Sequence, residues 1–213
     1  MIRIFKGGKP KKLEDNSAEW TRIVLSKLAA GVEISSAEKT RYSHKDIKDA
    51  IVDETHGKCA YCESDIRHIA YGDIEHVVPK KIEPAKWFEW ENLTLACDVC
   101  NTNKGSEVDI VDPYNCDPEE RFAFLGASIW GIPGDEEAVL TERTLELNRD
   151  ELVSKRTERI EHLMKLVNVI QGTKNPKLKA LFRDDFENEI RDEAEYAALS
   201  RMLHRELKRR GVL

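Results

Sequence analysis

The sequence predicts an α+β fold, with helices at both ends of the chain and short strands in a cysteine-bearing middle part. Apolar residues recur at intervals of three and four near both ends, which is typical of amphipathic helices. The middle part carries two C-x-x-C pairs and apolar runs of strand length. We therefore expect N-terminal helices over 1–57, a core over 58–115, a short β-containing connector over 116–147 and a helical C-terminal lobe over 148–213.

The composition is that of a soluble globular protein, with 40% hydrophobic and 35% charged residues among 213. No stretch reaches the roughly 18 apolar residues of a membrane helix, and the basic start lacks the apolar part of a secretory signal. The sequence therefore predicts a cytoplasmic protein with no membrane partner. A formal net charge of −6 argues against holding nucleic acid by overall charge, but leaves local basic sites open.

Two helices are predicted before the first cysteine pair. The first spans 17–30, where Ser17 is a suitable N-cap and Gly31 a natural end. The second spans 43–56, and Gly57 directly follows it.

Strands are predicted over 71–78, over 93–96 and over the apolar, aromatic run 122–132. Beyond residue 148 the chain is predicted to be helical, with one apolar stripe over 160–170 and a second over 178–203. Both stripes are typical of core packing.

The cysteine spacing predicts one structural zinc site. Each C-x-x-C pair places two thiolates on a tight turn, and the two pairs together complete a tetrahedron. An iron–sulfur cluster and a set of ordinary buried cysteines are the alternatives. The zinc ligands would be the cysteines at both ends of the middle part, Cys59, Cys62, Cys97 and Cys100.

Between the two pairs, Glu75 and His76 can serve hydrolysis of a phosphodiester. An imidazole titrates near neutral pH, so His76 can take a proton from water. The Glu75 carboxylate is a hard oxygen ligand for Mg²⁺ or Mn²⁺, an ion that would stabilise the leaving oxygen. Asp73 lies two residues earlier, on the same face of a strand as Glu75.

The segment Cys59–Gly105 resembles the zinc-ribbon HNH endonucleases. The resemblance lies in C-x-Y-C-E, I-E-H-V-V-P-K, W-E-N-L and A-C-x-x-C-N-x-x-K-G. It implies a ββα-metal finger, two strands and a helix around one divalent ion. Many members have a His at the third motif position, where this chain has Asn101. An amide oxygen can also bind Mg²⁺, so the departure puts metal preference in doubt rather than activity.

The resemblance assigns roles to further residues of this chain. His76, Glu75, Asn92 and Asn101 would be catalytic. The side-chain amide of Asn92 would orient the imidazole by holding a loop between the strands, and Asn101 would join Glu75 on the Mg²⁺ or Mn²⁺ ion. Three lysines would contact nucleic acid: Lys80, Lys81 and Lys104.

The flanks Asp112-Pro113, Asp117-Pro118-Glu119 and Thr141–Leu152 look like HNH proteins encoded with retrons and with the Septu anti-phage system. There the nuclease works beside an ATPase. This closer resemblance implies the toxic effector of an anti-phage system, with an ATPase partner and, in the retron case, an RNA–DNA complex. The substrate, DNA or transfer RNA, stays open.

The alternative is a zinc-ribbon adaptor or binding module without nuclease activity. The acidic charge balance and the missing third His favour it. The presence of Glu75, His76 and Asn92 argues against it.

Overall fold

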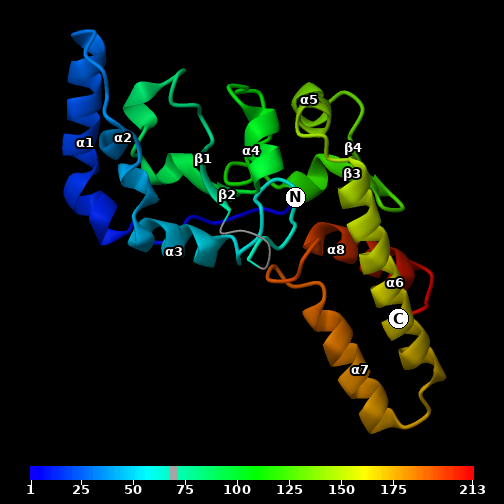
Figure 1. The fold of residues 1–213 in the computed structure, drawn as a ribbon. Helices are drawn as coiled ribbons and strands as arrows, with labels where there is room; N and C mark the ends of the chain where they lie inside the picture. The colour runs from blue at the N-terminus through cyan, green and yellow to red at the C-terminus, as the bar shows by residue number, and fades with distance from the viewer. Residues whose placement is uncertain (68–71) are drawn as a thin grey trace.

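The computed structural model describes residues 1–67 and 72–213 and confirms the α+β prediction (Figure 1). Helices α1–α3 lie along one side, two small sheets and two helices form the centre, and the C-terminal helices extend from it. Four short 3-10 helices complete the described elements: η1 (Arg41–Ser43), η2 (Pro84–Lys86), η3 (Trp90–Asn92) and η4 (Pro118–Glu120).

The first helix, α1 (Lys11–Ala29), begins earlier than predicted. The predicted start at Ser17 is wrong because Pro10 stands at the N-cap, where its fixed φ suits entry into a helix. Helix α3 (Lys45–Glu54) lies within its predicted range, and Gly57 has the positive φ expected after a helix. The short helix between them, α2 (Ser36–Lys39), was not predicted, although Ser35 and Glu38, which cap it reciprocally, follow the S-x-x-E pattern of a capping box.

The centre of the molecule is a ββα unit, as the resemblance implied. Strand β1 (Asp73–His76) pairs antiparallel with β2 (Leu93–Ala96), with His76 opposite Leu93. Helix α4 (Asp98–Lys104) follows β2 directly, and the Cys97 side chain caps it. The strand predicted in the run 71–78 is thus confirmed as the four residues of β1, and Tyr71 lies outside the described residues.

The run 122–132 forms strand as predicted, and a turn divides it into the two strands of a hairpin. Strands β3 (Phe122–Leu125) and β4 (Ser128–Gly131) pair antiparallel across a turn in which Gly126 has φ +61°. Helix α5 (Glu136–Thr144) packs on β4 so closely that a Cβ at Gly131 would lie 2.5 Å from a backbone nitrogen of the helix.

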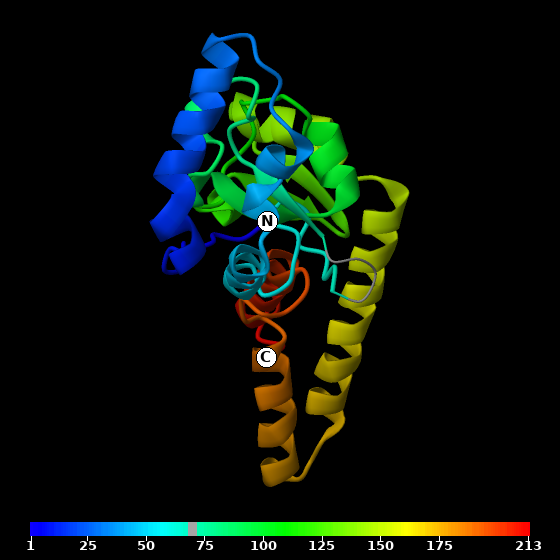
Figure 2. The same ribbon diagram turned by 60° about the vertical axis from the view of Figure 1, so that its left-hand side comes forward.

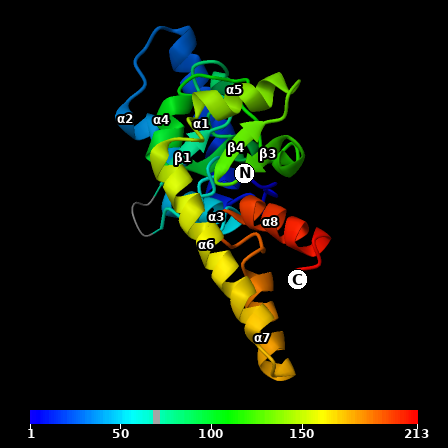
Figure 3. The same ribbon diagram turned by 90° about the vertical axis from the view of Figure 1, so that its right-hand side faces the viewer.

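The C-terminal lobe contains α6 (Asp150–Gly172), α7 (Pro176–Asn188) and α8 (Ala197–Arg209). Helices α6 and α7 run side by side as a hairpin that projects from the centre of the molecule. Helix α8 lies back against that centre (Figures 2 and 3). The predicted stripe over 178–203 is therefore not one helix. Its helix is broken where Lys58 Nζ binds the carbonyls of Asp192 and Ala194, oxygens that a continuous helix would use itself.

Two hydrophobic clusters match this division. The larger joins the N-terminal helices, the ββα unit and the β3–β4 hairpin, through residues such as Leu13, Ile51, Leu95 and Ile129. The smaller lies between the C-terminal helices: Leu163, Val167, Ile170, Phe186 and Leu207. The segment boundaries expected from the sequence stay a prediction. Within 1–67 and 72–213, no helix is both long and apolar enough to span a membrane.

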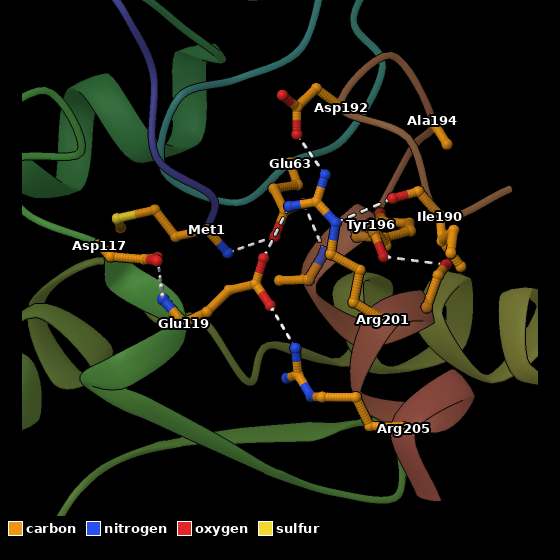
Figure 4. Close-up of polar contacts among 12 residues, drawn as sticks. Met1, Glu63, Asp117, Glu119, Ile190, Asp192, Ala194, Tyr196, Arg201 and Arg205 are labelled. Atoms are coloured by element: carbon orange, nitrogen blue, oxygen red, sulfur yellow. Dashed lines mark hydrogen bonds and ion pairs between the residues drawn. The ribbon is translucent and has the colours of Figure 1, made fainter. Parts of the chain in front are cut away.

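Charged groups fasten the C-terminal lobe to the centre (Figure 4). Glu63, in the loop of the first cysteine pair, binds the Met1 ammonium group and accepts a hydrogen bond of 3.2 Å from the Ala198 amide. Glu119 binds both Arg201 and Arg205 of α8, at 2.7 and 2.9 Å. The lobe is thus anchored next to the cysteine pairs.

Candidate metal centres and active site

The four cysteines converge on one point. Their sulfur atoms all lie within 4.8 Å of one another, and those of Cys62 and Cys97 are 3.9 Å apart. A tetrahedral ion with metal–sulfur bonds of about 2.3 Å separates its sulfurs by about 3.8 Å. The number, kind and spacing of these sulfurs therefore suit a zinc ion.

Local backbone geometry builds this cluster. In the first pair the chain turns tightly, with Glu63 in the left-handed region at φ +64° and its amide donating to Cys59 O. In the second pair, Cys97 caps α4 and accepts a hydrogen bond of 3.4 Å from the Cys100 amide. Hydrogen bonds from Cys100 and Cys59 hold the pKa of the Cys62 thiol well below its ordinary value, which favours the thiolate that metals require.

His76 ends β1 with its imidazole buried. Its Nε2 lies 2.9 Å from the Trp87 carbonyl oxygen. A carbonyl only accepts, so Nε2 carries the hydrogen and the neutral ring keeps its lone pair on Nδ1. Burial, assisted by the nearby Lys80 charge, lowers the pKa of His76 to about 3, well below the near-neutral value expected from the sequence. The ring is therefore neutral at physiological pH.

Asn92 holds the loop that supplies this carbonyl. Its Oδ1 accepts from the Val78 amide at 2.7 Å, and its Nδ2 donates to the carbonyls of Val78 and Lys86 at 3.0 Å each. These hydrogen bonds of the Asn92 side chain link both ends of the loop that contains Trp87. Asn92 thus holds a loop between the strands, as expected, and this loop supplies the Trp87 carbonyl that contacts the imidazole.

The proposed ligands of the catalytic ion lie on the other face of β1, toward α4. Asp73 Oδ2 accepts from Asn101 Nδ2 at 3.1 Å, and Glu75 Oε1 accepts from Lys104 Nζ at 2.9 Å. Burial raises the pKa of Glu75, and Lys104 opposes this rise. Oxygens of Glu75 and Asn101 are hard donors of the kind that Mg²⁺ or Mn²⁺ prefers, and Asp73 lies beside Asn101 without belonging to the expected ligand pair.

Lys104 is buried in an ion pair and is not free to make the phosphate contact that was expected from the resemblance. Only 1% of its side chain is exposed, and its ammonium binds both Glu75 and the His76 carbonyl. A phosphate contact would require this ion pair to open. Lys81 is exposed, and Lys80 is half-buried beside His76.

Tyr42 belongs to the site although nothing in the sequence singled it out. Its ring stands edge-on to the His76 imidazole, with centroids 4.6 Å apart and planes at 86°. Its hydroxyl accepts a hydrogen bond of 3.0 Å from Lys80 Nζ, which also lies 4.8 Å from the Tyr42 ring centre. Tyr42 lies 34 positions before His76, outside every motif, so only the fold could reveal it.

Residues 59–107, which contain the ββα unit with its cysteine cluster and the buried His76, match the family model described as HNH endonuclease. Over most of its length the chain is also similar to two proteins named Septu protein PtuB. It is 25% identical to that of Bacillus mycoides (strain KBAB4) over 236 aligned residues, which cover 92% of this chain and 79% of that protein. It is 26% identical to that of Bacillus thuringiensis over 182, covering 81% and 66%.

These comparisons confirm the resemblance to HNH endonucleases and to Septu proteins. The names of the two relatives do not mention a retron, so the retron part of the resemblance has no support from them.

Proposed function

We propose that the protein is a metal-dependent endonuclease that hydrolyses phosphodiester bonds in nucleic acid. The hydrogen bond between His76 and the Trp87 carbonyl carries this proposal, because it leaves Nδ1 as a proton acceptor on a neutral ring. The match of residues 59–107 to HNH endonucleases supports the same reaction.

In the proposed reaction, Nδ1 of His76 accepts a proton from a water molecule. The water oxygen attacks phosphorus, and the bond from phosphorus to one ester oxygen breaks. Lys80, held by Tyr42, offers positive charge beside the imidazole, and Lys81 adds charge on the adjoining surface. A Mg²⁺ or Mn²⁺ ion on Glu75 and Asn101 would polarise the phosphate and stabilise the leaving oxygen.

The four cysteines hold a structural zinc ion in this proposal. Four protein ligands leave no open position for a substrate, so the ion would stabilise the fold rather than react.

The cellular role follows from the similarity to Septu proteins. We propose that the chain is the toxic effector of an anti-phage system and acts with an ATPase partner. The net charge of −6 supports a partner that supplies part of the grip on DNA or transfer RNA. The projecting α6–α7 hairpin offers a surface for that partner.

The second candidate, a zinc-ribbon adaptor without nuclease activity, is favoured by one observation. Lys104 neutralises Glu75, the residue expected to bind the catalytic ion. An adaptor would need no free carboxylate there.

A cleavage assay separates the two functions. Wild type, His76→Ala and the control His162→Ala, which alters an exposed His of α6, are incubated with Mg²⁺ on supercoiled plasmid and on total transfer RNA. We expect wild type and the control to cleave one substrate, and both EDTA and His76→Ala to abolish cleavage, a loss of about 10²-fold or more. If wild type is inactive both alone and with its co-expressed ATPase, the nuclease proposal is wrong.

A further inference from the structure

Arg149, the residue at the N-cap of α6, lies against the cysteine cluster. Its Nη1 is 3.9 Å from the Cys100 sulfur, and its Nη2 is 3.9 Å from the sulfurs of both Cys97 and Cys100. The guanidinium also donates to the carbonyls of Leu145 and Glu146, at 3.2 and 3.3 Å. These bonds fix the planar group with one edge toward the two sulfurs.

A zinc ion on four thiolates leaves an excess of two negative charges, because the ion offsets only two of four. Cys59, Cys62 and Cys100 are buried, and a buried charge without a partner is costly. Arg156, another nearby arginine of α6, donates instead to the carbonyls of Leu147 and Ala127. Arg149 is therefore the arginine placed to offset the charge of the metal centre.

We propose that Arg149 is the charge-compensating partner of the four-cysteine metal centre and fastens the start of α6 to it. The inference rests on the zinc occupancy proposed above. Arg149 does not bind the ion. It acts through the sulfurs of Cys97 and Cys100, so it is a positioning residue of the site.

The other cysteine pair has a parallel link to the C-terminal lobe. Ser64 Oγ lies 3.3 Å from the Cys62 sulfur and 2.8 Å from the hydroxyl of Tyr196, the N-cap residue of α8. The starts of α6 and α8 thus each lie one or two side chains from a zinc ligand. Since α6 continues into the projecting hairpin, the metal centre sets where that hairpin begins.

Lysine can replace only part of this arrangement. The planar guanidinium reaches two sulfurs and two carbonyls at once, whereas a lysine ammonium is a single point charge on a flexible stem. The conservative variant Arg149→Lys therefore keeps the charge and loses the geometry, and Arg149→Gln loses the charge while keeping an amide donor.

The test measures zinc retention and does not depend on nuclease activity. Wild type, Arg149→Lys, Arg149→Gln and the control Arg143→Gln are purified with zinc, and release to an excess of the chromogenic chelator 4-(2-pyridylazo)resorcinol is timed. Arg143 is the matched control because its side chain, on α5, is 73% exposed. We expect Arg149→Gln to release zinc about 10-fold faster than wild type, Arg149→Lys to fall between them, and the control to match wild type.

A cobalt-substituted sample gives a second readout, the sulfur-to-metal charge-transfer band, which we expect to shift in Arg149→Gln and not in Arg143→Gln. Release at the wild-type rate with an unshifted band would overturn the inference. If Arg149→Gln does not fold, the zinc-release rate and the charge-transfer band of Arg149→Lys test the inference in its place. Wild type purified without any metal would instead refute the zinc proposal on which the inference rests.

Hydrogen exchange tests the link to α6. In zinc-loaded Arg149→Gln, we expect faster amide exchange at residues 150–156 and unchanged exchange in α1. Unchanged exchange in both helices would show that Arg149 does not fasten α6.

Discussion

The imidazole of His76 and the backbone carbonyl of Trp87 form a hydrogen bond of 2.9 Å, and this contact decides which ring nitrogen can accept a proton. Trp87 is itself held from outside the HNH segment, because its indole nitrogen donates to the Lys39 carbonyl at 3.4 Å. The N-terminal helices therefore contribute to the geometry of the proposed base.

Replacing Asn92 by Ala should weaken both the fold and catalysis. The change leaves the Val78 amide and two carbonyls without their partner, which we expect to cost about 1–3 kcal/mol of unfolding free energy. The cleavage rate should fall by more than the loss of folded protein explains, since the Trp87 carbonyl is no longer fixed. Urea unfolding and cleavage rates on the same samples check this, with Asn168→Ala, at an exposed position of α6, as the control. Unchanged cleavage would mean that the loop does not position His76.

Tyr42→Phe should raise KM more than it lowers kcat. The variant keeps the ring beside His76 and loses only the hydrogen bond to Lys80, worth about 1 kcal/mol or 5-fold. If Tyr42 acts by holding Lys80, the effects of Tyr42→Phe and Lys80→Ala should not add in a double-mutant cycle. Additive effects on KM would separate the two residues.

The sequence was sufficient for the parts of the molecule that local patterns encode. Cys59, Cys62, Cys97 and Cys100 meet as their spacing predicted, because a C-x-x-C turn fixes two sulfurs by itself. The ββα order followed from the motifs between them.

Contacts between distant segments were not predictable in this way. The break before α8 depends on Lys58, more than 130 positions earlier in the chain, which takes two carbonyls of the segment. Tyr42 contacts His76, and Arg149 contacts the cysteines, from outside Cys59–Gly105. Arg149 lies in the flank Thr141–Leu152, but no spacing rule connects either residue to these sites. The burial of Lys104 against Glu75 likewise results from how α4 packs on β1.

Removing the zinc ion proposed for the four cysteines should destabilise the whole larger core. The cysteine pairs support the ββα unit, whose residues pack with the N-terminal helices in one cluster. We expect Cys100→Ser, or treatment with a strong chelator, to lower the melting temperature markedly, whereas Cys116→Ser should not, since Cys116 lies outside the cluster of four. Calorimetry with a zinc assay checks this. Equal melting temperatures for wild type and Cys100→Ser would contradict it.

In Lys104→Met, the melting temperature should depend on the divalent ion proposed to bind Glu75. The variant leaves the Glu75 carboxylate buried without its cation, and breaking such a pair costs about 3–5 kcal/mol. A divalent ion can replace the lost charge, so Mg²⁺ or Mn²⁺ should raise the melting temperature of Lys104→Met more than that of wild type. Lys81→Met is the control, because Lys81 is exposed, and it should respond as wild type does. An equal rise in Lys104→Met and wild type would mean that Lys104 and the ion do not compete for Glu75, and the proposed ligand role of Glu75 would lose its support.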